Sequence, residues 1–226
     1  LGSLQTTQQD HGSLLHGQAL VTGGLGDLGL LVAAWLGQQP GLQVHLTGRT
    51  ACGAATPLAL LSPQGCVTAT MADSSACEDT EHLANESPAM LTSIIHAGGV
   101  LRDGVLANQT AAGLRTVIAP KAQGMAALEA ATGAMPLAGF TAFSSIAALL
   151  GSAGQANYAA ANAMLEAASA ARQARGLSGL SLTLGAWAVG MAGKNAAVAQ
   201  RLQASGVGII QPATGLAAVA HAVASA

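Results

Sequence analysis

Short apolar runs alternate with longer amphipathic or alanine-rich segments along the chain. The apolar runs fall at residues 18–22, 44–49, 66–70, 91–96, 137–143 and 180–185. Runs of this length, bounded by glycine or polar residues, are typical of buried strands, and the segments between them are long enough for crossover helices. The pattern therefore predicts an α/β protein with a Rossmann-type, doubly wound parallel sheet that carries helices on both faces.

The intervening segments predict the helices and two irregular regions. Helices are expected at residues 30–38, 117–131, 196–204 and 212–223, and a long alanine-rich helix is expected to contain Tyr158 and to end near residue 175. The second of these helices carries Pro120 and Gly124 near its start, which predicts an interruption there. Residues 51–65 predict a weak helix and a loop, and the glycine-rich residues 186–193 are suited to a mobile lid.

The first 17 residues are rich in Gln, Ser and Gly and show no periodicity. We expect residues 1–17 to be a linker or a cut end, which leaves residues 18–226 as one domain.

The composition excludes several classes of protein. The chain has 226 residues, of which 51% are hydrophobic and 8% charged, and its net charge is −2 without a basic block. These values exclude a disordered chain and a nucleic-acid-binding protein. There is no long uninterrupted apolar segment and no signal pattern, so we expect a soluble protein of the cytoplasm or an organelle that does not bind membranes. The three cysteines show no metal spacing, and no metal is expected.

A glycine-rich turn follows the first predicted strand and precedes a helix. Gly24, Gly26 and Gly29 permit a tight turn, close approach of a pyrophosphate to the backbone, and close packing of the helix. Arg49 ends the second predicted strand, where an arginine suits a 2′-phosphate and an acidic residue would suit a free ribose. This favours NADPH over NADH, and the alternative is a solvated arginine at a strand end.

Polar side chains also gather at the ends of the fourth and fifth predicted strands. Ser145 ends the fifth strand, Tyr158 follows it by 13 positions, and Asn162 lies one helical turn after Tyr158. A hydroxyl and a phenol that face each other can donate hydrogen bonds to a carbonyl oxygen on which charge develops. The alternative is a tyrosine packed against a loop. His96 is expected to pack or to bond a loop, rather than to bind a metal, and the small residues Ala97 and Gly98 would let a nicotinamide lie against the backbone.

These motifs resemble the catalytic half of a ketoreductase domain from a polyketide synthase or an animal-type fatty acid synthase, within the short-chain dehydrogenase/reductase superfamily. The resemblance runs from about Gln18 to the C-terminus and is carried by residues 22–29, 96–104, 117–124, 143–162 and 201–215. It implies reduction of a β-ketoacyl thioester, held on the phosphopantetheine arm of an acyl carrier protein, by NADPH. It also implies neighbouring synthase domains as partners, and a preceding structural subdomain that 17 residues cannot supply.

The resemblance assigns roles to individual residues. Tyr158 is implied as the proton donor and Ser145 as the second donor to the ketone oxygen, and Lys121 and Asn162 complete a tetrad. Lys121 would be the cation that lowers the pKa of Tyr158, although a lone lysine is more often a solvated side chain. The residues implied to bind the cofactor are Thr22, Gly23, Gly24, Leu25, Gly26, Leu28, Gly29, Arg49, Ala97 and Gly98.

A further set is implied to control the configuration of the product: Leu101, Asp103, Leu150, Gln155 and Met191. Family members that give a D-hydroxy product resemble one another in a Leu-Asp-Asp segment, which here is Leu101-Arg102-Asp103. The opposite class has a tryptophan at the position of Leu150, so we expect a D-hydroxy product. Two positions depart from the family pattern, because Thr70 stands where an adenine-binding Asp is usual and Thr50 where a basic residue is usual.

The sequence also admits two alternatives to the reductase. A freestanding dehydrogenase acting on a small alcohol usually has lysine at the position of Asn162, which argues against it. A catalytically silent domain that only holds its neighbours together is opposed by the intact set of Ser145, Tyr158, Lys121 and Asn162.

Overall fold

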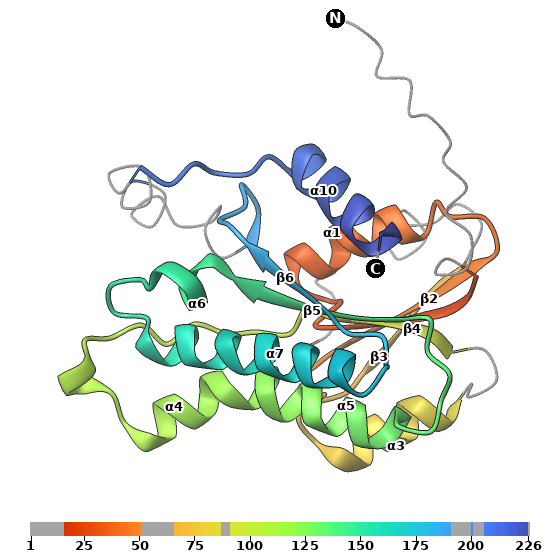
Figure 1. Cartoon of the computed structure of the whole chain (residues 1–226), viewed down its shortest axis with the longest axis horizontal. Helices are drawn as coiled ribbons and strands as arrows, with labels where there is room; N and C mark the ends of the chain where they lie inside the picture. Colours follow the sequence, from red (N-terminus) through yellow and green to blue (C-terminus); the bar gives the residue numbers. More distant parts are fainter. Residues whose placement is uncertain (1–15, 51–65, 87–90, 191–199, 201–205, 226) are drawn as a thin grey trace, which may run out of the picture.

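The computed structural model describes residues 16–50, 66–86, 91–190, 200 and 206–225. Within these residues, six parallel strands form one sheet in the order β3-β2-β1-β4-β5-β6 (Figure 1). The strands are β1 (Gly17–Thr22), β2 (Leu42–Gly48), β3 (Val67–Met71), β4 (Leu91–His96), β5 (Gly139–Ser145) and β6 (Leu180–Leu184). All six predicted strands are present, and the predicted doubly wound parallel sheet is confirmed.

Helices cover both faces of the sheet (Figure 1). Helices α1 (Asp27–Leu36) and α10 (Pro212–Ala224) pack on one face, where Val32, Val219 and the strand residue Phe143 share one apolar core. Helices α3 (Cys77–Glu86), α5 (Gly124–Thr132) and α7 (Ala156–Ala174) cover the other face, where Leu165 packs with Phe140. The sheet is therefore buried on both sides, as its apolar strands require.

The helix predicted at residues 117–131 belongs to a longer helical run. Helix α4 (Ala111–Ile118) passes into a π-helical turn, η2 (Ala119–Gln123), and then into α5. Pro120 lies in the π turn, whose wider backbone accommodates a residue without an N–H. The predicted interruption is thus a change of helix type, and the chain does not leave the helix.

The glycine- and serine-rich segment after β5 contains a short helix, α6 (Ile146–Leu150). Ser145 forms its N-cap, and its Oγ accepts a hydrogen bond from Ala147 N at 3.2 Å. A short 3-10 helix, η1 (Leu106–Asn108), precedes α4. The predictions for residues 51–65, for helix 196–204 apart from residue 200, and for the end of the lid lie outside the described residues.

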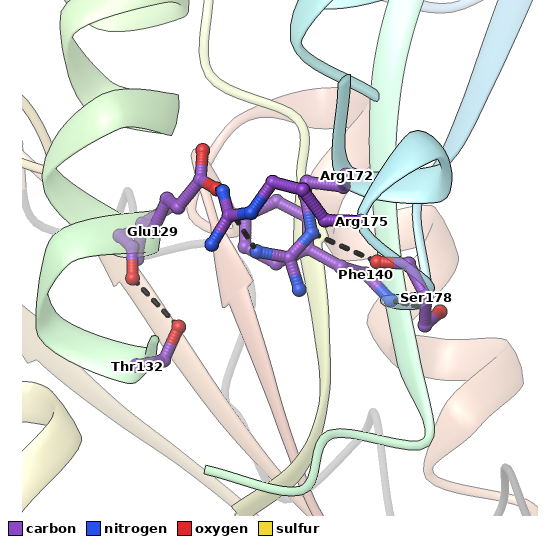
Figure 2. Close-up of polar contacts among 7 residues, drawn as sticks. Glu129, Thr132, Phe140, Arg172, Arg175 and Ser178 are labelled. Atoms are coloured by element: carbon purple, nitrogen blue, oxygen red, sulfur yellow. Dashed lines mark hydrogen bonds and ion pairs between the residues drawn. The ribbon is translucent and has the colours of Figure 1, made fainter. Parts of the chain in front are cut away.

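The C-terminal end of α7 is tied to the sheet by a buried arginine (Figure 2). The Arg172 guanidinium lies 4.4 Å from the centroid of the Phe140 ring, and its Nε donates to Ser178 O at 2.8 Å. Glu129 of α5 lies 3.8 Å from Arg172 Nη1 and also pairs with Arg175. These contacts hold α7 against β5 and α5 at the end remote from Tyr158.

None of the helices in the described ranges is long and apolar enough to cross a membrane.

Candidate active site

A cleft of about 380 Å³ lies at the carboxyl edge of the sheet. The order of the strands reverses between β1 and β4, which is where open α/β sheets bind their ligands. The cleft is lined by the glycine turn after β1, by the ends of β2 and β4, and by Lys121, Ser145 and Tyr158. The residues singled out in the sequence therefore meet at one edge.

The glycine turn packs so closely that no Cβ fits at Gly23 or Gly29. A Cβ at Gly23 would lie 2.6 Å from the Cα of Gly98, and Gly23 has a φ of +67°. A Cβ at Gly29 would lie 2.4 Å from Gly23 O and 2.5 Å from the Cα of Gly24. At Gly26 the nearest such contact is 3.3 Å, and this residue lines the cleft. The turn therefore brings bare backbone to the floor of the cleft.

The start of α1 offers backbone donors at the same floor. Gly26 is its N-cap and supplies no side-chain hydrogen bond to the first turn. The first N–H groups of a helix carry partial positive charge and suit an anion such as a pyrophosphate. Leu28 and Gly29, in the first turn of α1, line the cleft beside the glycine turn.

Arg49 and Asp73 stand at one end of the cleft. Arg49 is exposed and follows β2, and Asp73 follows β3. Burial by itself raises the pKa of the Asp73 carboxyl, but hydrogen bonds from Ser75 and the charge of Arg49 oppose this, and the net pKa lies below its ordinary value. Asp73 lines the cleft, whereas Thr70, which stands where an adenine-binding Asp is usual in the family, lies outside the cleft lining.

Lys121 comes from the π-helical turn, and its side chain reaches Tyr158 and the end of β5. Its side chain is 3% exposed, and its Nζ lies 5.4 Å from the centroid of the Tyr158 ring. Nζ donates to the carbonyl oxygen of Phe143 at 3.0 Å, two residues before Ser145. The lysine therefore ties η2 to the end of β5, beside the tyrosine.

The pKa values in this cluster differ from the expectation that Lys121 lowers that of Tyr158. Burial raises the pKa of the Tyr158 phenol, the neighbouring side chains of Asn162 and Ser145 lower it, and the charge of Asp103 adds to the increase. Burial also lowers the pKa of Lys121 to about 8. The predicted decrease at Tyr158 is wrong, because desolvation outweighs the neighbouring groups and the ammonium is directed at a carbonyl oxygen.

Asn162 lies one turn beyond Tyr158 on α7. Its Nδ2 donates to the carbonyl oxygen of Tyr158 at 2.7 Å. Its Oδ1 is buried and has no hydrogen-bond partner among the described residues. This acceptor is therefore available for a hydrogen bond one helical turn from Tyr158.

His96 is fully buried between the glycine turn and the lysine. Its Nδ1 lies 2.6 Å from Thr22 Oγ1, and its Nε2 lies 2.9 Å from the carbonyl oxygen of Lys121. Burial lowers the pKa of the imidazole to about 4, so the ring is neutral near pH 7. The ring packs and bonds the backbone, as sequence analysis favoured, and no group of three or more His, Cys, Asp or Glu in the described ranges could hold a metal.

The segment after β4 is hydrogen-bonded to the loop before α7. Gln155 Nε2 donates to both carboxylate oxygens of Asp103 at 3.2 Å, and Gly104 N donates to Gly154 O at 2.8 Å. Two residues implied to control product configuration are thus in direct contact.

Asn157 strengthens this connection and was missed by sequence analysis. It is 2% exposed, and its Nδ2 donates to Arg102 O at 2.8 Å and to Gln109 Oε1 at 3.1 Å. Its Oδ1 accepts from Tyr158 N at 2.8 Å. An amide directly before the tyrosine in an alanine-rich helix was the available signal.

The remaining predicted residues lie around the cleft. Thr22 and Gly24 are buried behind the cleft wall. Leu101 is half-buried, Leu150 is 70% exposed at the end of α6, and Met191 lies outside the described residues. The predicted cofactor residues that line the cleft are Gly23, Leu25, Gly26, Leu28, Gly29, Arg49, Ala97 and Gly98.

Comparisons with known proteins agree with this arrangement. Residues 17–189 match the model of the KR domain family. The chain is 39% identical over 229 residues to polyketide synthase GfsB of Streptomyces halstedii, covering 93% of the chain and 4% of that protein. It is 40% identical over 214 residues to the spectinabilin polyketide synthase system protein NorB of Streptomyces orinoci, covering 89% of the chain and 10% of that protein.

Solved structures give the same result. One described as an A-type ketoreductase from a modular polyketide synthase superposes with a TM-score of 0.88 at 36% identity, over 94% of this chain and 46% of that chain. The first ketoreductase of the tylosin synthase superposes with a TM-score of 0.82 at 32% identity, over 93% of this chain and 46% of that chain. The chain thus spans about half of these ketoreductases and a small part of the curated synthases. From its sequence match, its fold and its cleft, the chain belongs to the ketoreductase (KR) domains of polyketide synthases, within the short-chain dehydrogenase/reductase superfamily.

Proposed function

We propose that the chain is an NADPH-dependent β-ketoacyl reductase. Its substrate is a β-ketoacyl thioester on the phosphopantetheine arm of an acyl carrier protein, and its product is the β-hydroxyacyl thioester. The observation that carries the proposal is the meeting of Ser145, Tyr158 and Lys121 at one cleft whose floor is a glycine turn. Membership of the KR family supports reduction of a ketoacyl group.

The residues of the cleft fit a dinucleotide phosphate. The glycine turn and the uncapped start of α1 suit a pyrophosphate, and Arg49 suits a 2′-phosphate at the end of β2. Ala97 and Gly98 follow β4 and leave backbone exposed to a flat ring. When bound, NADPH supplies the hydride that reaches the ketone carbon.

The chain's own residues bind and protonate the ketone oxygen. The hydroxyls of Ser145 and Tyr158 donate hydrogen bonds to this oxygen, and Tyr158 transfers its proton to it. The raised pKa of Tyr158 keeps the phenol protonated before reaction, as a proton donor requires. Lys121, whose pKa is about 8, still carries its proton near pH 7 and stabilises the phenolate that the transfer leaves.

We further propose that the product has the D-hydroxy configuration. This rests on Asp103, which is retained from the Leu-Asp-Asp pattern, and on the absence of tryptophan at Leu150. The hydrogen bonds from Gln155 to Asp103 place this carboxylate beside the start of the catalytic helix.

The proposed setting is a multidomain synthase in which residues 18–226 form a catalytic domain. The chain spans 4% of polyketide synthase GfsB and 10% of NorB, so neighbouring domains and a carrier protein are the expected partners. A polyketide or a fatty acid is the expected final product class.

The experiment that tests the function follows NADPH consumption with a short β-ketoacyl thioester. The wild-type chain is compared with Tyr158→Phe, and NADPH binding is measured separately by fluorescence. We expect turnover to fall by roughly 100-fold or more in the variant, with NADPH affinity nearly unchanged. Equal turnover in both proteins would remove Tyr158 from the mechanism, and folded wild-type protein that binds NADPH without turnover would support a catalytically silent domain.

A further inference from the structure

A carboxylate on α7 joins the catalytic helix to the ends of two strands. Glu166 Oε1 accepts a hydrogen bond from Ser144 Oγ at 2.7 Å and a second from Thr183 Oγ1 at 3.0 Å. Ser144 and Thr183 are direct partners in the β5–β6 ladder. One carboxylate oxygen thus holds α7, β5 and β6 together.

This junction lies on the same two elements as Tyr158 and Ser145, the proposed donors to the ketone oxygen. Tyr158, Asn162 and Glu166 follow one another at intervals of one helical turn on α7. Ser144 directly precedes Ser145, and its hydroxyl also lies 3.4 Å from the carbonyl oxygen of Asn162. The two donors to the ketone oxygen therefore sit on elements that Glu166 connects.

The junction is buried on its β5 side. Ser144 is 4% exposed, Glu166 is half-buried and Thr183 is exposed. Hydrogen bonds to an ionised carboxylate are shorter and about twice as strong as neutral ones, and a hydroxyl without its partner at this depth is unfavourable. The Glu166 carboxylate is therefore suited to fix how far α7 stands from the end of β5.

We infer that Glu166 is a positioning residue for ketone reduction, which sets the distance between the phenol of Tyr158 and the hydroxyl of Ser145 through its bonds to Ser144 and Thr183. This inference rests on the proposed function. No contact of Glu166 with the cleft is involved, since it does not belong to the cleft lining.

The other end of α7 supplies a matched control. Glu129 of α5 holds this end through Arg172 and Arg175 (Figure 2). Both glutamates anchor the same helix, but only Glu166 is near Ser145. Glu129→Ala is therefore expected to weaken the fold without changing kcat.

The test compares Glu166→Ala, Glu166→Gln and Glu129→Ala in the full chain. Glutamine keeps a carbonyl oxygen that can accept both hydroxyls, so it should retain activity close to wild type. In Glu166→Ala we expect kcat to fall by roughly 100-fold, the size expected for a small misplacement of a catalytic group, with little change in NADPH affinity. The double variant Ser144→Ala, Thr183→Val removes the same hydrogen bonds from the strand side and should reproduce this loss even if Glu166→Ala folds poorly.

A second readout does not depend on turnover. Tyr158 is the only tyrosine in the chain, so the ultraviolet absorbance of tyrosinate reports its ionisation alone. Of the charged groups around the phenol, Lys121 and Asp103 are kept in every variant. A displaced phenol becomes hydrated, and its pKa should move toward the ordinary 10.0 further in Glu166→Ala than in Glu166→Gln.

The results separate the two proposals. If Glu166→Ala lowers stability but leaves kcat and the ionisation of Tyr158 as in Glu129→Ala, Glu166 has only a structural role and the inference is wrong. If the wild type has no reductase activity, the pKa of Tyr158 still tests the positioning role of Glu166. A pKa shift in Glu166→Ala that is largely absent from Glu166→Gln supports this role. Equal pKa values in these two variants contradict it.

Discussion

The Nζ atom of Lys121 lies 5.4 Å from the centroid of the Tyr158 ring, yet it donates its hydrogen bond to the carbonyl oxygen of Phe143. Lys121 is buried and Tyr158 half-buried, and burial moves their pKa values in opposite directions, raising that of the phenol and lowering that of the ammonium to about 8. Both groups are therefore protonated near pH 7. Burial favours the neutral phenol, whereas the charged ammonium keeps its proton against a desolvation cost.

Lys121 should make the fold more stable in base. Between pH 8 and 10.5 the unfolded chain keeps the lysine proton that the folded chain has lost, so the free energy of unfolding rises with pH in this window. The increase should be on the order of 1 to 3 kcal/mol. Urea unfolding of the wild type and of Lys121→Met across this pH range measures the increase, which the variant should lack. If the free energy of unfolding rises equally with pH in both proteins, the prediction is wrong.

His96 should contribute to unfolding in acid. Its pKa is about 4 in the folded chain and 6.5 ordinarily, so the stability it provides is complete above pH 6.5 and is lost as the pH falls toward 4. The loss should be on the order of a few kcal/mol. Urea unfolding of wild type and His96→Gln between these pH values measures it, and the variant should show a shallower decrease. Parallel curves would mean that other groups cause the acid unfolding.

Arg49 should determine the choice of cofactor. Arg49→Asp places a negative charge at the end of the cleft, which disfavours a 2′-phosphate and suits a free ribose. The ratio of kcat/KM for NADPH to that for NADH should fall by roughly 10- to 100-fold, as expected for one charge-assisted hydrogen bond. Arg115→Asp changes an exposed arginine of α4 outside the cleft and serves as the control. An unchanged ratio in Arg49→Asp would place recognition of the phosphate elsewhere.

Asn157 should influence the configuration of the product. Asn157→Asp keeps the oxygen that accepts from Tyr158 N but loses the donors to Arg102 O and Gln109 Oε1. The segment that carries Asp103 should then be held less firmly, and the excess of the major β-hydroxy product should fall about 10-fold, the effect of one lost buried hydrogen bond. Chiral chromatography of the product measures this ratio. Gln109→Leu removes one connection of Asn157 and also the hydrogen bond from Gln109 Nε2 to Gly104 O, so it should lower the ratio as well. A variant Asn157→Asp with the wild-type ratio argues against the connection.

Much of the fold was predictable because it depends on local pattern. The six strands follow from short apolar runs bounded by glycine and polar residues, and their parallel order follows from the long connections between them. The glycine turn was predictable because a tight turn and close backbone contact have few other solutions. The π-helical turn at Pro120 was not, since a proline in a helical pattern is compatible with a kink, a break or a wider turn.

The sequence by itself determined which residues reach the carboxyl edge of the sheet, because strand ends and the helix that follows each of them are defined locally. Only the tertiary structure decided the pKa values of Tyr158 and Lys121, since desolvation depends on everything packed around a group. It also decided the partners of Glu166, because these depend on the pairing of Ser144 with Thr183 and on the rotation of α7 over both strands. Spacing along a chain specifies a helix face, but it does not specify which neighbouring strand that face will meet.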